Sequence, residues 1–475
     1  MAVFRSRTSA LFLLLLVLLF HLPLLFSGRE LEKKHVHGAD MGLNSYRHML
    51  KMKSLVPAST CNPPPTERVG SLPLVHRQGP GSPLLEERPQ RRNSTLIFLW
   101  DQPRINSIRR SLASSSSSPS SIGNDLDGTN LRIPVIPSEG GREYVVTVGL
   151  GTPTRDLPMI FDTGSNLTWT QCLPCPTQGC CPQIDRCFEP SKSSTYSDPS
   201  CSPSCNYSAS YADNSFSYGY YAQDTLTLSA DYTFPNFIFG CGQNNSDGFS
   251  NNAGILGLAR GDYSLISQTT STFALIFCYC IPPTYNGQGY LLFGMGALKN
   301  CQTNQYTSIL PDQTKPSWYF VELLGITIGN QTLEFSELVP SSSSSRTIID
   351  SGTTISRLPP SVYAALRDEF KKEMSEYPVA RQHLPSLGLD TCYNLEGYDS
   401  VALPKVVLNF DGADVNVDPS GVVWRESDSQ VCLAFTPKEK ENDQTIIGST
   451  QQRNLNILYN IQENKVEFGT GSCGS

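Results

Sequence analysis

The sequence has little histidine in its larger part. Five of its six histidines lie before residue 131, which leaves His383 alone in residues 131–475. A catalytic site that joins serine or cysteine to histidine would depend on that one residue, and a metal site of several histidines is excluded there. We therefore expect carboxylates to carry the chemistry of this part of the chain.

Charge is also scarce. Charged residues make up 17% of the 475 residues, against roughly 25% in average globular proteins, and this low-charge composition favours β structure. The net charge of -7 is the sum of residues 1–130, with 16 Lys and Arg against 9 Asp and Glu (+7), and residues 131–475, with 20 against 34 (-14). A body this acidic is a poor non-specific binder of nucleic acid, so we expect no nucleic-acid partner.

Long hydrophobic runs are absent apart from Ala10–Phe20, which follows a basic start. The run is shorter than the ~20 residues that a membrane span needs, and His21 and Pro23 interrupt it, which argues against the alternative of a membrane anchor. We interpret residues 1–28 as a cleaved secretory signal peptide and expect a secreted protein without a membrane partner.

Cysteine, in contrast, is plentiful. The chain has 15 cysteines, of which 14 follow Cys61. An even number in a secreted body indicates up to seven disulfides. Residues 172–205 hold seven cysteines, and Cys172 and Cys175 among them have the spacing of zinc ligands. A zinc site is thus the alternative, but secretion favours disulfides, and we expect no metal and no cofactor.

Sequons for N-glycosylation begin at Asn93, Asn166, Asn206, Asn244 and Asn330. A sequon accepts a glycan where it lies on the surface of a secreted protein. We expect Asn244 and Asn330 to be such surface sites. We expect Asn166 to be buried and unmodified, because it lies four residues after a candidate catalytic aspartate.

The chain divides into a leader and a β-rich body. Residues 29–130 lack sustained strand alternation and end in serine-rich sequence, so we interpret them as a removable basic prosegment and linker. Short β-type runs between Gly, Pro and Asn turns follow, at Tyr144–Val148, Asp224–Leu228, Phe237–Phe239, Tyr290–Phe293, Val406–Phe410 and Leu455–Tyr459. Helical patterns occur at Pro360–Met374 and Ser264–Thr269. We predict an all-β fold with minor helices.

A weak internal repeat runs through the body. In each of two units an apolar run leads to an aspartate, a hydroxyl residue and a glycine, at Asp162–Gly164 and at Asp350–Gly352, and no third such triplet occurs in the chain. Each unit also ends in two apolar residues and a glycine, at 255–257 and 446–448. Duplication of one β lobe would produce this pattern. We predict a first lobe at 131–315 and a second at 316–475.

The two triplets suggest a specific chemistry for Asp162 and Asp350. Two carboxylates within about 3 Å of each other share a proton, because both cannot ionise. The charged member can take a proton from a water molecule while the protonated member donates to a substrate carbonyl. The hydroxyls of Thr163 and Ser351 can hydrogen-bond to the opposite loop and hold the two lobes in register.

The motifs resemble those of the pepsin-fold aspartic proteases of the plant nepenthesin-like type, over nearly all of residues 67–473. The similar segments are Val75–Pro80, Val148–Pro153, Phe161–Cys172, Gly254–Leu258, Ile349–Thr353 and Ile446–Gln452. The resemblance implies a bilobal fold with the active-site cleft between the lobes. It also implies an endopeptidase, active at acidic pH, with a preference for apolar residues around the cleaved bond. The location that it implies is the apoplast or cell wall, with the vacuole as the alternative.

The resemblance also assigns residues outside the aspartate pair. A hairpin flap covers the cleft in this family, and Tyr211 matches its tyrosine, with Trp169 as its support. The alternative is that Tyr211 is an ordinary strand aromatic. Gly164, Gly352 and Thr353 match residues that line the substrate site.

A disulfide and the binding partners complete these expectations. Cys392–Cys432 is the pair that we expect in the second lobe. The expected partners are protein or peptide substrates and the chain's own prosegment, and the expected state is a monomer. Two rival functions stay open: a catalytically weak inhibitor or binding protein of the plant cell wall on the same fold, and a nucleoid-type DNA-binding protease.

Overall fold

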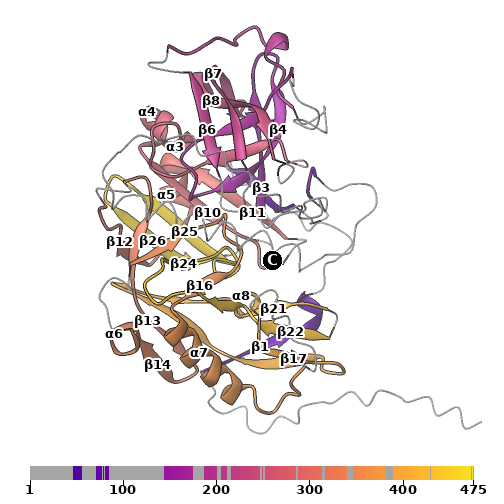
Figure 1. Ribbon diagram of the computed structural model, residues 1–475, viewed down its shortest axis with the longest axis vertical. Helices are drawn as coiled ribbons and strands as arrows, with labels where there is room; N and C mark the ends of the chain where they lie inside the picture. Colours follow the sequence, from indigo (N-terminus) through magenta and orange to yellow (C-terminus); the bar gives the residue numbers. More distant parts are fainter. Residues whose placement is uncertain are drawn as a thin grey trace, which may run out of the picture.

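The computed structural model has two lobes, one above the other in Figure 1. Tyr211, Cys175, His383 and the predicted signal peptide and serine-rich linker lie outside the residues that the structure describes. The described residues are 46–55, 71–77, 79, 81–84, 144–174, 187–200, 205–210, 216–246, 249, 252–284, 287–312, 316–339, 346–380, 389–427, 429–471 and 473.

A large sheet forms the first lobe and the region between the lobes. In the described part of the chain, 13 strands follow one another in it. All neighbours are antiparallel except the pairs β4–β9 and β5–β8, which are parallel. The order is β12 (Gln305–Ser308), β26 (Lys465–Thr470), β25 (Leu455–Asn460), β10 (Ile276–Cys280), β11 (Gln288–Phe293), β2 (Leu72–His76), β3 (Tyr144–Leu150), β4 (Arg155–Asp162), β9 (Gly254–Gly257), β5 (Trp169–Gln171), β8 (Tyr232–Asn245), β7 (Phe216–Ser229) and β6 (Asn206–Ser210).

The second lobe, at the bottom of Figure 1, contains three smaller sheets among the described residues. The first has the order β20 (Ala413–Asn416), β19 (Val406–Phe410), β13 (Phe320–Ile328), β15 (Arg346–Ile349), β24 (Thr445–Ile447), β16 (Ser356–Leu358) and β23 (Phe435–Pro437), with β14 (Gln331–Glu334) beside β13. The second is β17 (Cys392–Asn394), β22 (Gln430–Leu433) and β21 (Val423–Arg425). The third pairs β1 (Arg47–Lys51) with β18 (Ser400–Pro404).

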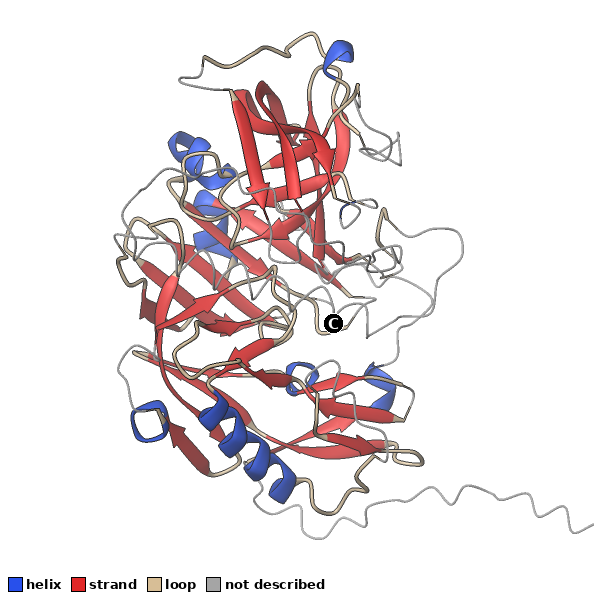
Figure 2. Cartoon of the chain, in the orientation of Figure 1, coloured by secondary structure: helices blue, strands red, loops and turns tan. Residues whose placement is uncertain are grey.

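Helices are few and mostly one turn long, as Figure 2 shows. The long one is α7 (Pro360–Glu373), which begins with proline and places basic residues in its last turn. It buries Val362, Tyr363, Leu366 and Phe370 along one face. The other described helices are η1 (Met52–Leu55), η4 (Pro190–Lys192), α3 (Leu265–Gln268), α4 (Thr270–Phe273), α5 (Gly294–Asn300), α6 (Phe335–Leu338) and α8 (Pro419–Val422). None of the described helices is long and apolar enough to cross a membrane.

Each predicted strand run lies within an observed strand, and both predicted helices form, as α3 and α7. The prediction of an all-β fold with minor helices is confirmed. Strand β19 has the predicted bounds, whereas β7 extends the predicted run Asp224–Leu228 to 14 residues, because its turn-like start pairs with β6 and β8.

The end of the chain joins the two lobes. Strands β25 and β26 follow the second lobe in sequence, but β25 pairs with β10 in the large sheet. Apolar residues of both lobes form one continuous hydrophobic cluster. Within it the rings of Phe410 and Phe468 stack, with 5.2 Å between their centroids. The lobes therefore share a core rather than meeting only at a surface.

Two strands come from the segment that was predicted to be a prosegment without strand pattern. Strand β1 pairs with β18 of the second lobe, and β2 lies between β11 and β3 of the large sheet. Strand β2 shows no alternating pattern, since Leu74, Val75 and His76 are buried in succession, and the interpretation as a prosegment stays a prediction. A strand that is covered on both faces shows no polar and apolar alternation.

The side chain of Asp390 connects α7 with the segment before β17. Tyr363 Oη donates a hydrogen bond of 2.5 Å to Asp390 Oδ1, Thr391 donates one of 2.8 Å to the same oxygen, and Arg367 donates one of 3.3 Å to Oδ2. Burial by itself raises the pKa of Asp390, but the hydrogen bonds from Tyr363, Thr391 and Arg367 outweigh it and hold the pKa below its usual value. The ionised carboxylate of Asp390, which accepts these hydrogen bonds, is thus the form that stabilises the fold.

The replacement Tyr363→Phe removes a hydrogen bond to Asp390 and should make the free energy of unfolding less dependent on pH. Because the folded-state pKa of Asp390 is depressed, its contribution is complete above the unfolded value of about 3.9 and is lost as the pH falls through the folded value. Asp390 is partly exposed, so we expect a loss of at most about 1 kcal/mol at pH 7 and a smaller one at pH 2. Urea unfolding at both pH values measures this, with Tyr232→Phe at an exposed tyrosine as the control. An equal loss at both pH values would contradict the assignment.

Candidate active site

The two predicted aspartates occupy equivalent positions in the two lobes. Asp162 ends β4, which runs parallel to β9, and Asp350 directly follows β15, which runs parallel to β24. Both carboxylates are fully buried. The strand pairs place each aspartate beside the glycine that ends the same repeat: Asp162 is paired with Gly257, and Asp350 N–H donates to the carbonyl of Ile447, next to Gly448.

The hydrogen bonds of the two carboxylates are the same in both lobes. Gly164 N–H donates to Asp162 Oδ1 at 2.9 Å, and Gly352 N–H donates to Asp350 Oδ1 at 3.1 Å. A hydroxyl three residues after each aspartate donates to the second oxygen at 2.5 Å, from Ser165 in the first lobe and from Thr353 in the second. Each carboxylate is therefore fixed in orientation by one backbone and one side-chain donor.

A reciprocal set of hydrogen bonds joins the two aspartate loops. Thr163 N–H donates to Ser351 Oγ and Ser351 N–H donates to Thr163 Oγ1, each at 3.0 Å. The same hydroxyls donate onward, Thr163 to the carbonyl of Ile349 at 3.4 Å and Ser351 to that of Phe161 at 3.3 Å. All of these groups are buried. The bonds hold the two loops, and with them the two aspartates, side by side at the boundary between the lobes.

Aromatic residues lie beneath the aspartate loops. Phe161 and Tyr279 meet edge to face at 4.9 Å, Tyr279 stacks on Tyr459, and Tyr279 Oη donates to Gln452 at 2.6 Å. Burial raises the pKa of Tyr459, and the nearby charge of Asp350 raises it further, so this hydroxyl stays protonated at every pH at which proteins remain folded. These buried tyrosine side chains beside the aspartate loops are thus aromatic and uncharged.

A model of the eukaryotic aspartyl protease family matches residues 143–471. The chain belongs to the eukaryotic aspartyl protease family. It is 37% identical to an aspartyl protease family protein of Arabidopsis thaliana over 456 residues, 90% of this chain and 93% of that protein. It is 32% identical to the aspartic proteinase nepenthesin-1 of Nepenthes gracilis over 358 residues, 71% of this chain and 79% of the relative. The predicted nepenthesin-like membership is thereby confirmed.

Solved structures agree on the fold of this aspartyl protease family member. Basic 7S globulin from soybean superposes with a TM-score of 0.57 at 20% sequence identity, covering 70% of this chain and 95% of the globulin. The prediction of a bilobal pepsin-like fold is confirmed. Membership in the eukaryotic aspartyl protease family supports a peptidase, a class of hydrolase.

The structure places only part of the predicted flap. Trp169 on β5 is fully buried and meets Phe249 edge to face at 4.8 Å. Strands β6 and β7 pair from Asn206 with Tyr220 to Ser210 with Phe216. Tyr211 follows β6 directly and lies outside the described residues, so its role stays a prediction.

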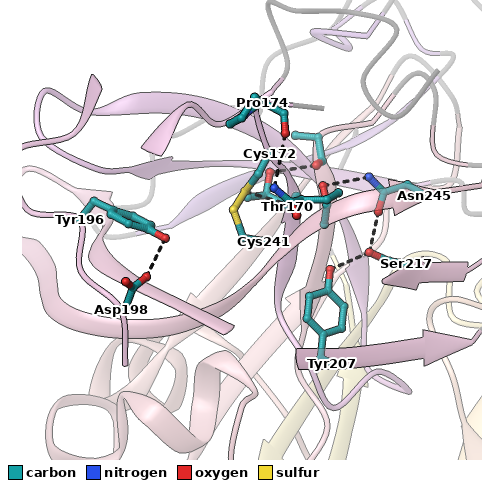
Figure 3. The surroundings of a disulfide bond; sticks show 12 residues. Thr170, Cys172, Pro174, Tyr196, Asp198, Tyr207, Ser217, Cys241 and Asn245 are labelled. Atoms are coloured by element: carbon teal, nitrogen blue, oxygen red, sulfur yellow. Dashed lines mark hydrogen bonds between the residues drawn. A yellow bond between two sulfur atoms is a disulfide. The ribbon is translucent and has the colours of Figure 1, made fainter. Parts of the chain in front are cut away.

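A chain of hydrogen bonds runs through the base of the β6–β7 hairpin (Figure 3). Tyr207 Oη donates to Ser217 Oγ at 2.7 Å, and Ser217 donates to Asn245 Oδ1 at 2.7 Å. Asn245 Nδ2 in turn donates to the carbonyl of Gly242 at 3.2 Å. All three side chains are buried, so the chain ties β6, β7 and β8 together where the hairpin begins.

The replacement Tyr207→Phe should destabilise this hairpin modestly. The ring stays buried, but Ser217 loses a donor, which costs about 1 kcal/mol for a neutral buried hydrogen bond. We expect a lower midpoint of thermal unfolding and faster hydrogen exchange in β6 and β7. Tyr218→Phe, at an exposed ring on β7 of the same hairpin, is the matched control. If both variants behaved alike, the Tyr207–Ser217–Asn245 chain would have no stabilising role.

Four disulfides are formed between described cysteines. Besides the expected Cys392–Cys432 pair, they are Cys172–Cys241, Cys278–Cys301 and Cys280–Cys473. Figure 3 shows the Cys172–Cys241 bond, which links the residue after β5 to β8. Cys172 is therefore a disulfide partner and not a zinc ligand, which argues against the zinc alternative. The described residues contain no group of three or more potential metal ligands.

The sequons give one correction. Asn244 on β8 and Asn330 in the turn between β13 and β14 are exposed, as a glycan acceptor requires. The prediction that Asn166 is buried is wrong, because the turn after Asp162 brings its side chain to the surface. There it covers Gly261, where an added Cβ would lie 1.2 Å from Asn166 Oδ1. Asn166 thus occupies the space that the missing side chain leaves.

Sequence reasoning assigned Thr353 to the substrate site and overlooked Ser165. In the structure both hydroxyls bond to an aspartate oxygen, which makes them equivalent orienting residues. The sequence contains a signal for Ser165, because a hydroxyl residue follows the Asp-Thr/Ser-Gly triplet in both repeats. Gly164 and Gly352 also contact the carboxylates, through their backbone N–H groups.

Proposed function

We propose that the protein is a secreted aspartic endopeptidase that hydrolyses peptide bonds with a water activated by Asp162 and Asp350. The observation that carries this proposal is the paired geometry: two buried carboxylates, each oriented by the same two donors, on loops joined by reciprocal hydrogen bonds. A binding protein on the same fold would have no need of two carboxylates held in this matched arrangement.

The reaction that we propose is general acid–base catalysis without a covalent intermediate. One aspartate is ionised and takes a proton from the water, whose oxygen adds to the carbonyl carbon of the substrate. The other is protonated and donates its proton to the carbonyl oxygen, which gives a neutral diol. The aspartate that took the proton then gives it to the amide nitrogen, while the other aspartate takes a proton from a diol hydroxyl. The C–N bond breaks, the acid and the amine leave, and the pair again holds one proton. Because the reaction needs one aspartate ionised and the other protonated, we expect a bell-shaped activity profile at acidic pH.

The N-terminal strands support the proposal that residues 29–130 include a prosegment. Val75 on β2 and Leu84 are buried in the same hydrophobic cluster as Trp169 and Tyr207 at the base of the β6–β7 hairpin. A segment in this position would limit access of a substrate to the cleft in the unprocessed chain. Backbone pairing and apolar packing both contribute to this contact.

An assay on unfolded protein tests the proposed function. The processed protein should cleave a denatured substrate at pH 3–5 and not at pH 7, and pepstatin should block cleavage. Mass spectrometry of the products should find apolar residues on both sides of the cleaved bonds. No cleavage in acid, or cleavage that pepstatin leaves unchanged, would reject the proposal. Retention of the mature form on a DNA column at moderate salt would instead favour the DNA-binding alternative.

A further inference from the structure

The segment 46–55 is bound to the second lobe as a structural strand. Strand β1 pairs antiparallel with β18 over five residues, from Arg47 with Pro404 to Lys51 with Ser400. The pairing continues at both ends, since Lys405 N–H donates to Tyr46 at 2.7 Å and Met52 N–H donates to Asp399 at 3.0 Å. This contact is independent of the one that β2 makes with the large sheet.

Strand β18 depends on β1 for its backbone hydrogen bonds. Within the described residues, β1 is the only strand that pairs with β18, in a sheet of two. The amide of Ala402, on the other edge of β18, donates to Tyr377 Oη at 2.8 Å rather than to a strand. Val401 and Leu403 are buried. Removal of β1 would therefore leave the amides on one edge of a buried strand without their partners, which is costly.

Side chains add to the backbone pairing. Leu50 and Met52 are each 7% exposed and belong to the main hydrophobic cluster of the protein, whereas Met49, which points away, is 65% exposed. Arg47 reaches the end of α7, where its guanidinium donates to the side chain and carbonyl of Glu373 at 3.2 and 2.9 Å. It also donates to Glu376, just after the helix, at 2.7 Å. The surface made by the β18 edge and these two glutamates fits an extended peptide with one basic and two buried apolar residues.

We propose that residues 46–55 stay bound to the second lobe after the prosegment is cut, so that the processed protein consists of two chains. The short chain is then a permanent structural strand, separable from the part of the prosegment around β2 that lies near Trp169. The inference rests on the proposed function only in that the prosegment must be cleaved in the cell. It needs no catalytic activity, so its failure would be distinguishable from failure of the proposed function.

Cleavage at an engineered site tests the retention of β1. A recognition sequence for a specific protease is inserted between residues 60 and 66 of the full chain, so that cutting separates β1 from β2. After cleavage at neutral pH in 0.5 M salt, we expect the peptide with residues 46–55 to co-elute with the large fragment in size-exclusion chromatography. Elution of that peptide in the small-peptide fraction would overturn the proposal.

Two variants of β1 locate the interaction. Leu50→Asp places a charge in the buried face and should release the peptide after cleavage, whereas Met49→Asp places the same charge on the exposed face and should retain it. Hydrogen exchange at Lys405, whose amide bonds to Tyr46, gives a measurement on the unmutated strand. Its rate should change by less than about ten-fold on cleavage if β1 stays, and by more if β1 leaves. A fast rate, or equal retention by both variants, would refute the inference.

Discussion

Asp162→Asn should reduce peptide hydrolysis by about 10³-fold or more, the largest effect that we expect of any single replacement. An asparagine cannot accept a proton from the water, so the general base is lost while the side chain keeps its size. The amide would also direct two N–H donors into a site where Gly164 and Ser165 already donate to the aspartate. One of those donors would then face another donor, which disturbs the loop as well as the chemistry.

The matched variants make this result specific. Asp350→Asn should cause a similar loss, and the double variant should be little worse than either single one, because the two aspartates act as a unit. Asp411→Asn, at an exposed aspartate, should keep full activity. The assay uses processed protein and a denatured substrate at pH 3–5. Pepstatin-sensitive cleavage by Asp162→Asn at the rate of the parent would reject the assigned role of the pair.

Thr163→Val should weaken both the fold and the activity. Valine has the shape of threonine but removes the acceptor for Ser351 N–H and the donor to Ile349, so buried polar groups lose their partners. Each buried polar group that loses its hydrogen bond lowers the free energy of unfolding by about 1–3 kcal/mol. We expect a loss of about 2–4 kcal/mol in the free energy of unfolding, measured by urea denaturation. Because the two aspartates would no longer be held in register, kcat should fall by about 10²-fold with a smaller change in KM.

A double-mutant cycle separates this linkage from general damage to the core. Ser351→Ala removes the reciprocal acceptor, and the combined variant should lose less stability than the sum of the two single losses, since both act on one network. Thr163→Ser keeps the hydroxyl and should retain most of the activity. Strictly additive losses would show that the two hydroxyls stabilise their loops separately and do not join the lobes.

The aspartate pair and the lobes could be predicted from the sequence because the information is local and occurs twice. Asp162 and Asp350 each stand in a short motif that determines the turn and the hydrogen-bond donors to the carboxylate. Because the motif occurs twice, each copy supports the interpretation of the other. Strand β19 was predicted to the residue for a similar reason, since Val406–Phe410 is bounded by turn residues on both sides.

Pairings between distant segments could not be predicted. Nothing in the local pattern of Leu72–His76 indicates that this run lies between β11 and β3, or that Arg47–Lys51 pairs with β18 more than 350 residues later. The return of β25 to β10 is of the same kind. Such contacts are set by the edges that other strands leave open, and five-residue strands carry too little pattern to reveal them.

The bond between Cys280 and Cys473 encloses the second lobe in a covalent ring, because the two cysteines are 193 positions apart in sequence. A protease that cuts one peptide bond within this ring leaves both pieces attached to each other. Loss of material from the lobe would require two cuts, and a nicked molecule could keep its shared core and its aspartate pair. For the endopeptidase that we propose, which would meet copies of itself, this ring would keep a singly cut molecule in one piece, whereas a chain of the same fold without the disulfide would not have this protection.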